Sequence, residues 1–329
     1  MHLVTGGSGF LGAGLVRALL ARGDRVRIID DHSRGRPRRL DGLDAGLEVL
    51  VGDVRDADFV RSATEGSEIV WHLAYINGTK HFYERPDDVL DVGIRGTLNT
   101  IDAALDAGAK RYVFASTSET YNRPTHVPTN ESERLLIPDV LNPRFSYGGG
   151  KIAGELLTLH LAGRRGLETI IVRPHNIYGP DMGFAHVIPE IVQKILKGSD
   201  GGKKREITLP IQGDGSETRA FCHIDDGADG FMAAGLRGQN GEIYHLGREE
   251  EVSIRSLLLK IGAIMGVRLA LEPGPLRAGG TPRRCPDTTK LSTIGYTSRV
   301  PLEQGLTETV QWYVEHFRAT DSWRDELEP

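Results

Sequence analysis

Tyr147 and Lys151 are four residues apart, in a stretch that precedes an amphipathic run over residues 152–161. On a helix, residues i and i+4 lie on the same face, so the phenol and the ammonium group would be neighbours. A nearby ammonium group lowers the pKa of a phenol, which is otherwise about 10, and such a tyrosine can act as a base near neutral pH. Since any helix can hold this pair by chance, the pair needs support from other residues.

Hydroxyl side chains follow an apolar run, residues 112–115, that is typical of a strand: Ser116, Thr117, Ser118 and then Glu119. Ligands of open α/β sheets bind at the carboxyl ends of the strands, which is where these side chains would lie. Thr117 is therefore a candidate for binding a substrate oxygen, with the alternative that its hydroxyl only ties down a turn.

A glycine-rich segment follows the first predicted strand and opens the first predicted helix. It contains G-x-G-x-x-G through Gly7, Gly9 and Gly12, and a second glycine pattern through Gly6, Gly9 and Gly12. Glycine is needed because side chains would keep a pyrophosphate away from the amides at the helix N-terminus. Asp30 ends the second predicted strand, where a carboxylate can accept the hydroxyls of an adenosine ribose. Together these residues predict a dinucleotide site.

Four arginines crowd the loop after Asp30 and raise the alternative of NADP, whose 2′-phosphate they could bind: Arg34, Arg36, Arg38 and Arg39. A carboxylate at Asp30 would repel that phosphate, so NAD is favoured. Asp53 ends the third predicted strand, where it could bind the adenine or cap the next helix, and the residues leave both interpretations open.

Short apolar runs alternate with helical stretches over residues 1–115, which predicts βαβ units and a parallel sheet. The predicted strands are His2–Thr5, Arg25–Asp30, Leu47–Val51, Ile69–Leu73, Lys110–Ala115, Glu168–Arg173 and Glu242–Leu246, and the predicted helices include Phe10–Arg22 and Gly96–Ala107. We expect a Rossmann-type, doubly wound α/β domain over residues 1–173, with 216–246 returning to it. Residues 174–215 and 247–329 are expected to form a smaller, mixed α/β lobe that binds substrate.

Composition excludes several classes of protein. The formal charge of −5 and the pI of about 6.1 lack the basic excess of a general nucleic-acid binder. Two cysteines, Cys222 and Cys285, fit a reducing compartment, and no apolar stretch is long enough to span a membrane. An apolar strand near the N-terminus leaves no room for a signal peptide, and the histidines show no metal-binding spacing. We therefore expect a soluble, cytoplasmic protein without a metal.

Taken together, these motifs resemble the extended short-chain dehydrogenases/reductases, and specifically the NAD-dependent epimerase/dehydratase branch that acts on nucleotide sugars. The resemblance runs from residue 3 to beyond residue 310. It is carried by residues 6–12, 116–121, Tyr147-x-x-x-Lys151, 173–180, 213–221 and 283–287.

The resemblance implies that Thr117, Tyr147 and Lys151 form the catalytic set. Tyr147 would take the proton of the sugar C4 hydroxyl as hydride passes to NAD, Thr117 would hold that oxygen, and Lys151 would also bind the nicotinamide ribose. The implied NAD-binding residues are Gly6, Gly9, Phe10, Leu11, Gly12, Asp30, Asp53, Val54, Leu73, Ala74, Tyr147 and Lys151. The implied residues for the nucleotide-diphosphate sugar are Tyr75, Asn176, Arg219 and Arg283, and a homodimer is expected because relatives pair two of their helices with those of a second subunit.

Several positions depart from the family pattern. Gly93 stands where these enzymes usually carry an Asn, and Asn122 replaces the usual Gly after Tyr121. Tyr75 follows His72-Leu73-Ala74 where a smaller residue is commoner, which would narrow the sugar pocket. Three glycines, residues 148–150, separate the catalytic tyrosine from the lysine. These departures bear on substrate specificity.

Oxidation at C4 can lead to several reactions, and Glu119 distinguishes among them best. Epimerisation needs no further acid or base, dehydration needs both, and decarboxylation needs a substrate carboxylate and a pocket for it. Thr117-Ser118-Glu119 resembles the dehydratases and the UDP-glucuronate decarboxylases, so Glu119 is expected to be an acid/base. The alternatives are a 4-epimerase, an NADP-dependent reductase, and a Glu119 that caps a turn or pairs with Arg123.

Overall fold

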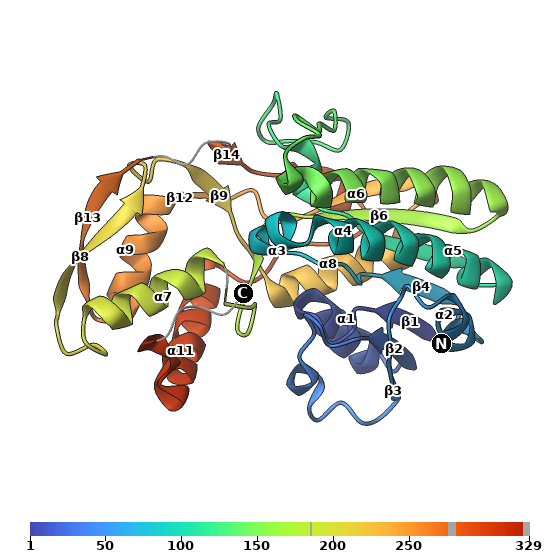
Figure 1. Cartoon of the computed structure of the whole chain (residues 1–329), viewed down its shortest axis with the longest axis horizontal. Helices are drawn as coiled ribbons and strands as arrows, with labels where there is room; N and C mark the ends of the chain where they lie inside the picture. The colour runs from blue at the N-terminus through green and yellow to red at the C-terminus, as the bar shows by residue number, and fades with distance from the viewer. Residues whose placement is uncertain (185, 276–280, 325–329) are drawn as a thin grey trace.

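Seven strands form the central sheet of the computed structural model, which describes residues 1–184, 186–275 and 281–324 (Figure 1). They are β1 (His2–Thr5), β2 (Val26–Asp30), β3 (Leu47–Val51), β4 (Ile69–His72), β5 (Arg111–Ala115), β6 (Glu168–Pro174) and β11 (Glu242–Leu246). All neighbours pair in parallel, in the order β11-β6-β5-β4-β1-β2-β3. The prediction of a parallel, doubly wound sheet is confirmed, and each predicted strand end lies within one residue of the observed one.

Helices cover both faces of this sheet, because successive side chains of each strand point to opposite faces. Val4 and Trp71 pack in one core with α1 (Phe10–Ala21) and α8 (Ile224–Arg237). Their neighbours Leu3 and Val70 pack in another, against α2 (Ala57–Thr64), α5 (Gly96–Asp106) and α6 (Ser146–Leu156). Strands that are apolar on both faces read as continuous hydrophobic runs, as expected of buried parallel strands.

Two long helical segments next to the sheet contain π-helical turns. The first runs through α4 (Pro86–Leu90) and a π segment, Asp91–Arg95, into α5, and it is preceded by α3 (Thr79–Glu84). The second continues from α6 into a π segment, Leu157–Ala162. π turns inside α-helices often occur near functional sites.

A smaller lobe surrounds a core of its own, formed by residues such as Ile188, Leu257 and Tyr313. Its helices are α7 (Val187–Gly198), α9 (Ile254–Ile264) and α11 (Leu302–Thr320), and its strands are β7 (Ile177–Tyr178), β8 (Glu206–Gln212), β9 (Thr218–Ala220), β10 (Cys222–His223), β12 (Glu251–Ser253), β13 (Arg268–Gly274) and β14 (Arg283–Arg284). They form the small sheets β13-β8, β10-β7 and β12-β9-β14. The short helix α10 (Thr289–Ser292) packs instead on β11 of the large sheet, where Leu291 joins the core of the large domain.

Strand pairing divides the segment 216–246, which we expected to return as a whole to the large domain. β9 and β10 pair with strands of the smaller lobe, whereas α8 and β11 join the layers of the large sheet. The domain boundaries themselves stay a prediction.

None of the helices within the described part of the chain is long and apolar enough to cross a membrane.

The strand order reverses at β1, which lies between β4 and β2. At such a switch point the connections leave toward opposite faces, and a crevice opens outside the carboxyl ends of the strands. Thr5, Asp30, His72 and Ala115 end their strands at this edge. The crevice brings together the motifs found in the sequence.

Candidate active site

The glycine loop between β1 and α1 is too tight for side chains at two of its positions. Gly6 has a φ of +71°, which favours glycine, and a Cβ at Gly12 would lie 2.1 Å from the Gly6 carbonyl oxygen. Gly9 begins α1, and no side chain among the described residues caps this helix. The first amides of α1 are therefore available to an anion, as a pyrophosphate requires.

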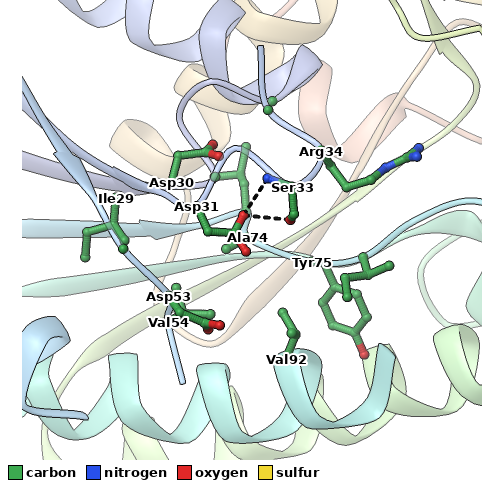
Figure 2. A pocket seen from close by; sticks show the side chains of 16 residues that line it. Ile29, Asp30, Asp31, Ser33, Arg34, Asp53, Val54, Ala74, Tyr75 and Val92 are labelled. Atoms are coloured by element: carbon green, nitrogen blue, oxygen red, sulfur yellow. Dashed lines mark hydrogen bonds between the residues drawn. The ribbon is translucent and has the colours of Figure 1, made fainter. Parts of the chain in front are cut away.

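A pocket extends from this loop along the carboxyl ends of β1, β2 and β4 (Figure 2). Its lining includes most of the residues expected to bind the cofactor, namely Gly6, Gly9, Asp30, Asp53, Val54, Leu73 and Ala74. Phe10, Leu11 and Gly12 lie in the first turns of α1, next to this lining. These residues fit a dinucleotide, since the pocket joins an anion-binding helix start to a carboxylate at the end of β2.

Asp30 is held firmly in that pocket. Its carboxylate accepts hydrogen bonds from the backbone amides of Ser8 (2.9 Å) and His32 (2.8 Å), and the residue is buried. A Cβ at Gly35 would lie 2.4 Å from its Oδ1, so glycine is needed there. Each carboxylate oxygen can still accept from a ribose hydroxyl.

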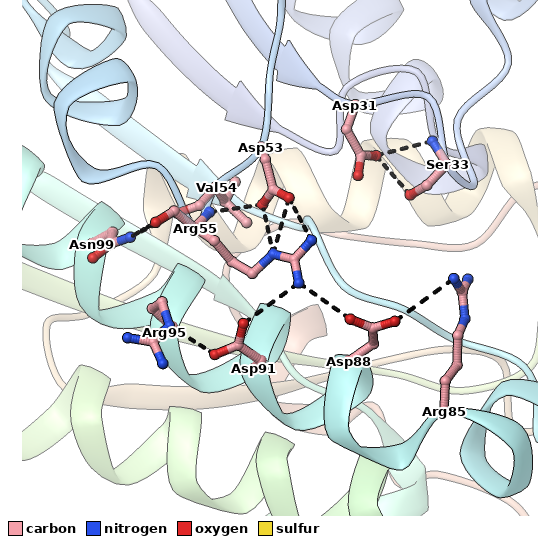
Figure 3. Close-up of polar contacts among 10 residues, drawn as sticks. All are labelled: Asp31, Ser33, Asp53, Val54, Arg55, Arg85, Asp88, Asp91, Arg95 and Asn99. Carbon is pink, nitrogen blue, oxygen red and sulfur yellow. Dashed lines mark hydrogen bonds and ion pairs between the residues drawn. The ribbon is translucent and has the colours of Figure 1, made fainter.

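Asp53 forms an ion pair with Arg55 instead of capping the helix that follows. Arg55 donates to both Asp53 oxygens and also contacts Asp88 and Asp91 (Figure 3). The hydrogen bond from Arg55 lowers the pKa of the Asp53 carboxyl. The cap of α2 is Asp56, whose side chain accepts from the Phe59 amide, so the capping alternative for Asp53 is wrong.

Three of the four loop arginines have partners on the protein itself. Arg34 lies 2.8 Å from His81 Nε2, and Arg38 and Arg39 both pair with Asp181 of the smaller lobe. The Asp181 contacts join the glycine-loop side of the large domain to the lobe. A 2′-phosphate is therefore not needed to explain why basic residues gather in this loop.

Tyr147 and Lys151 both lie on α6 and are both buried. The Tyr147 ring stacks on Phe82 at a centroid distance of 4.9 Å, and the Thr117 side chain is close enough to lower the pKa of its hydroxyl. The Lys151 ammonium group donates to the Ala115 carbonyl oxygen at 2.5 Å and lies 5.9 Å from the Tyr147 ring centroid. The structure thus brings Thr117, Tyr147 and Lys151 together at the carboxyl end of β5.

We expected the Lys151 ammonium group to lower the pKa of Tyr147, but it has no such effect in this arrangement. Burial raises the pKa of Tyr147, and only the hydrogen bond from Thr117 opposes it. Burial also lowers the pKa of Lys151 to about 7, so the ammonium form is costly. Both shifts have the same cause, which is that α6 places two ionisable groups where water does not reach them.

Glu119 pairs with Arg284, and not with Arg123 as the alternative had it. The Arg284 guanidinium lies 2.6 Å from Glu119 Oε1. Arg284 is the main cause that lowers the pKa of the Glu119 carboxyl, and Arg144 and Arg219 add to it. The charge of Glu119 also helps to raise the pKa of Tyr147, so this carboxylate acts electrostatically on the phenol. Glu119 is therefore ionised near neutral pH.

Arg283 and Arg284 point to opposite sides of β14, as neighbours on a strand do. Arg283 pairs with Glu251 and is half exposed, whereas Arg284 turns toward Glu119. The sequence interpretation chose Arg283 as the substrate-binding residue. A strand predicted at these residues would have placed Arg283 and Arg284 on opposite faces. However, residues 283–287 have no apolar pattern from which a strand could be predicted.

The remaining predicted substrate residues, Asn176, Arg219 and Tyr75, are all partly buried. Asn176 donates from its side-chain amide to the Ala220 carbonyl oxygen (2.9 Å), and Arg219 donates to the carbonyl oxygen of Thr218 (2.7 Å). Burial lowers the pKa of Arg219, and the positive charge of Arg284 adds to this effect. Tyr75 lines the dinucleotide pocket, and Figure 2 shows its ring pointing toward the helical segment that carries Val92. The roles of these residues in substrate binding stay predictions.

A buried ion pair next to Lys151 on α6 was not expected from the sequence. Arg173 at the end of β6 donates two hydrogen bonds to Glu155 of α6, at 2.8 and 2.6 Å, and both side chains are almost fully buried. Glu155 also accepts from Ser116. Because Glu155 follows Lys151 by one helical turn, its charge favours the ammonium form of that lysine. This pair ties α6 to the strand ends that carry the hydroxyl residues.

Comparison with known proteins identifies the group to which this architecture is related. The model of the NAD dependent epimerase/dehydratase family matches residues 2–247. The chain is 33% identical to a UDP-N-acetyl-alpha-D-glucosaminuronate decarboxylase of Bacillus cytotoxicus, over 95% of this chain and 97% of that one. It is 32% identical to a UDP-glucose 4-epimerase of Mycolicibacterium smegmatis, with 94% and 97% covered.

A solved structure shares the whole fold. A dTDP-glucose 4,6-dehydratase double mutant from Streptomyces venezuelae, determined with NAD bound, superimposes with a TM-score of 0.85 at 29% identity, covering 98% of this chain and 99% of that one. These three relatives carry three different reaction names.

Proposed function

Because the chain belongs to the NAD-dependent epimerase/dehydratase family, we propose that it oxidises a nucleotide-linked uronic acid at C4 and then removes C6 as carbon dioxide. NAD is the cofactor, and when bound it accepts the hydride from C4. The observation that carries this choice is the Glu119–Arg284 ion pair beside Tyr147.

The first part of the reaction uses the buried set on α6 and β5. Tyr147 takes the proton of the C4 hydroxyl, and Thr117 holds the same oxygen through its side chain. Burial alone would keep Tyr147 protonated, so the positive charge of Lys151 and of the cofactor must help the phenol to ionise when the site is filled. Lys151 is directed by its bond to Ala115, with its remaining N–H groups available to a ribose.

Arg284 favours a carboxylate substrate for the second part. Its guanidinium can bind a carboxylate through two parallel hydrogen bonds, and Arg144 and Arg219 add positive charge to the same place. Once C4 is a ketone, the C5–C6 bond can break, with its electron pair moving toward the C4 oxygen as carbon dioxide leaves. Thr117 and Tyr147 hold that oxygen while the negative charge is on it, and C5 then takes up a proton. The hydride that NAD would hold would then return to C4 as Tyr147 returns its proton to the C4 oxygen, so that the product differs from the substrate by carbon dioxide alone.

The charge state of Glu119 weighs against dehydration. A dehydratase needs an acid that protonates the leaving C6 hydroxyl, and a carboxyl whose pKa is lowered by Arg284 is a poor proton donor at neutral pH. An ionised Glu119 can instead act as a base or orient Arg284. The 4-epimerase alternative requires no group beyond Thr117, Tyr147 and Lys151, so the product must decide between them.

Product analysis tests the proposal directly. The purified enzyme is incubated with UDP-glucuronate and UDP-N-acetylglucosaminuronate, and in parallel with UDP-glucose and dTDP-glucose. We expect a mass loss equal to carbon dioxide with one of the uronates. A mass loss equal to water, or an unchanged mass with inversion at C4 by NMR, would contradict decarboxylation and establish the other reaction.

Substitution of the two neighbouring arginines tests the role of Arg284. Arg284→Gln should lower kcat/KM for the uronate by about a hundredfold, since a charged hydrogen bond to the carboxylate is lost. Arg283→Gln is the matched comparison and should cost much less, because Arg283 pairs with Glu251 on the other side of the strand. Equal losses of kcat/KM in the two variants would show that Arg284 does not bind the substrate carboxylate.

Glu119→Gln separates oxidation at C4 from the later step. If Glu119 acts after oxidation, the variant should still reduce its bound NAD when substrate is added but release no product. Unchanged product formation would show that Glu119 is not an acid/base.

A homodimer and a cytoplasmic location also belong to this proposal. The homodimer is supported by exposed apolar residues such as Leu90 on α4 and Leu156 on α6.

A further inference from the structure

Tyr75 occupies a space that two other segments leave for it, the π segment before α5 and the helix α6. It follows β4, and its hydroxyl is buried with no hydrogen-bond partner within the described residues. Its ring meets the Tyr147 ring edge to face, at a centroid distance of 5.2 Å and an angle of 89°. A buried phenol without a partner is costly, so the position of this side chain needs another explanation.

Two glycines make room for that phenol. A Cβ at Gly93, in the π segment before α5, would lie 2.1 Å from the Tyr75 hydroxyl oxygen and 2.2 Å from its Cζ. A Cβ at Gly150, on α6, would also lie 2.1 Å from the hydroxyl oxygen, but 3.4 Å from Cζ. At position 93 the Tyr75 ring itself leaves no room for a side chain. At position 150 only the Tyr75 hydroxyl does so.

The face of the Tyr75 ring is in contact with Lys151. The ammonium nitrogen lies 3.9 Å from the ring centroid, closer than to the rings of Phe114 (4.9 Å) or Tyr147 (5.9 Å). A cation over an aromatic face is stabilised by the ring quadrupole, and more strongly when water is excluded. Lys151 is 2% exposed, so the ring is one of the few groups that can compensate for its burial.

The other groups that face Lys151 are few. Glu155 on α6 favours the ammonium form, although its carboxylate is shared with Arg173 and Ser116. His72 at the end of β4 is held between Thr5 and Thr97, and burial keeps it neutral. Tyr147 is kept protonated by burial. Glu155 is thus the one negative charge near this lysine in the described part of the chain, and it is already paired.

We propose that Tyr75 is a positioning residue whose ring face holds the Lys151 ammonium group, and that Gly93 and Gly150 are required because they admit its phenol. Tyr75, Gly93 and Gly150 then form one unit in which the ring stabilises the charged form of the catalytic lysine. The inference does not depend on which reaction follows oxidation at C4, since it concerns only the state of Lys151.

The charge of Lys151 can be measured without a substrate. Protein carrying a carbon-13 label at the lysine ε position is titrated by NMR, and the Lys151 signal is assigned by its loss in Lys151→Met. Removal of the ring in Tyr75→Leu should lower the midpoint by about 0.5–1.5 pH units. Tyr75→Phe keeps the ring face and should titrate close to the wild type. A midpoint in Tyr75→Leu equal to that of the wild type would overturn the proposal.

The space argument has an independent test in thermal stability. Gly150→Ala should lower Tm, because its Cβ meets the Tyr75 hydroxyl, and Tyr75→Phe in the same chain should restore most of the loss. Gly93→Ala should not be rescued by Tyr75→Phe, because its Cβ also meets ring carbons. This difference holds even if Tyr75→Leu fails to fold.

Gly148 is the matched control in the same glycine run. A Cβ there would meet only the Glu119 carbonyl oxygen, at 3.6 Å, which is an ordinary contact. Gly148→Ala should therefore keep or raise Tm, since alanine favours the helix. A loss in Gly148→Ala as large as that in Gly150→Ala, or a failure of Tyr75→Phe to rescue Gly150→Ala, would contradict the assigned role of Gly150.

Discussion

Burial, more than neighbouring charge, decides the protonation states of Tyr147 and Lys151, the proposed catalytic residues. Tyr147 and Lys151 are both shielded from water, which raises the pKa of the phenol and lowers that of the ammonium group. The spacing of the two residues predicted their common helix face, and the structure confirms it. The spacing could not predict that the lysine points to the Ala115 carbonyl and lies over the Tyr75 ring, because those groups come from other parts of the chain.

Lys151→Met tests the cost of this buried charge. In the unfolded chain the lysine keeps its proton to about pH 10.5, whereas in the folded protein it loses the proton near pH 7. Between these values the unfolded chain binds more protons, so wild-type stability rises with pH relative to the variant. We expect the variant to be more stable than the wild type at pH 6 and the difference to shrink toward pH 10.

Urea denaturation over this pH range measures the difference. Lys110→Met serves as the control, because its side chain is largely exposed and it should show no such trend with pH. A stability difference for Lys151→Met that stays constant from pH 6 to 10 would show that the folded lysine titrates as it does in the unfolded chain.

At the scale of elements, α6 is held against the strand ends by side chains that are far apart in the sequence. The Arg173–Glu155 pair joins the end of β6 to the middle of α6, and Ser116 joins the end of β5 to the same carboxylate. The helix itself could be expected from the sequence, although three glycines weaken its start. Its partners could not, because charged residues in an amphipathic stretch are usually taken to be exposed.

Glu155→Gln should destabilise the protein strongly. The substitution leaves the Arg173 guanidinium buried without a negative partner, which costs about 3–5 kcal/mol in comparable cases. Asp106→Asn is the matched control, since it breaks the Arg61–Asp106 pair, in which both side chains are about half exposed. That loss should be about 0–1 kcal/mol. Chemical denaturation at neutral pH measures both, and similar losses would show that burial does not set the strength of the Glu155 pair.

At the scale of the whole molecule, ion pairs beside the candidate site join the large domain to the smaller lobe at two places. Arg38 and Arg39 of the glycine-loop side pair with Asp181, and Arg284 of the lobe reaches Glu119 at the end of β5. The second contact completes the proposed carboxylate site. In the proposed reaction, movement of the lobe away from the large domain would therefore prevent the step that follows oxidation.

The proposed homodimer is tested by substitution of one exposed leucine. Leu156 on α6 is 55% exposed, and Leu156→Glu should convert a dimer into a monomer because it places a charge in an apolar contact. Leu141→Glu is the control, since Leu141 is 88% exposed and lies outside these helices. Sedimentation velocity measures the state, and a monomeric wild type at micromolar concentration would refute the dimer.

The sequence alone determined the sheet, the dinucleotide loop and the positions of Thr117, Tyr147 and Lys151. These features depend on local rules, because glycine turns, strand alternation and helical spacing act between residues close in the chain. Only the tertiary structure decided that Arg284 and not Arg283 faces Glu119, and that Tyr75, Gly93 and Gly150 share one space. These contacts join residues far apart in the chain, so their geometry depends on how whole elements pack.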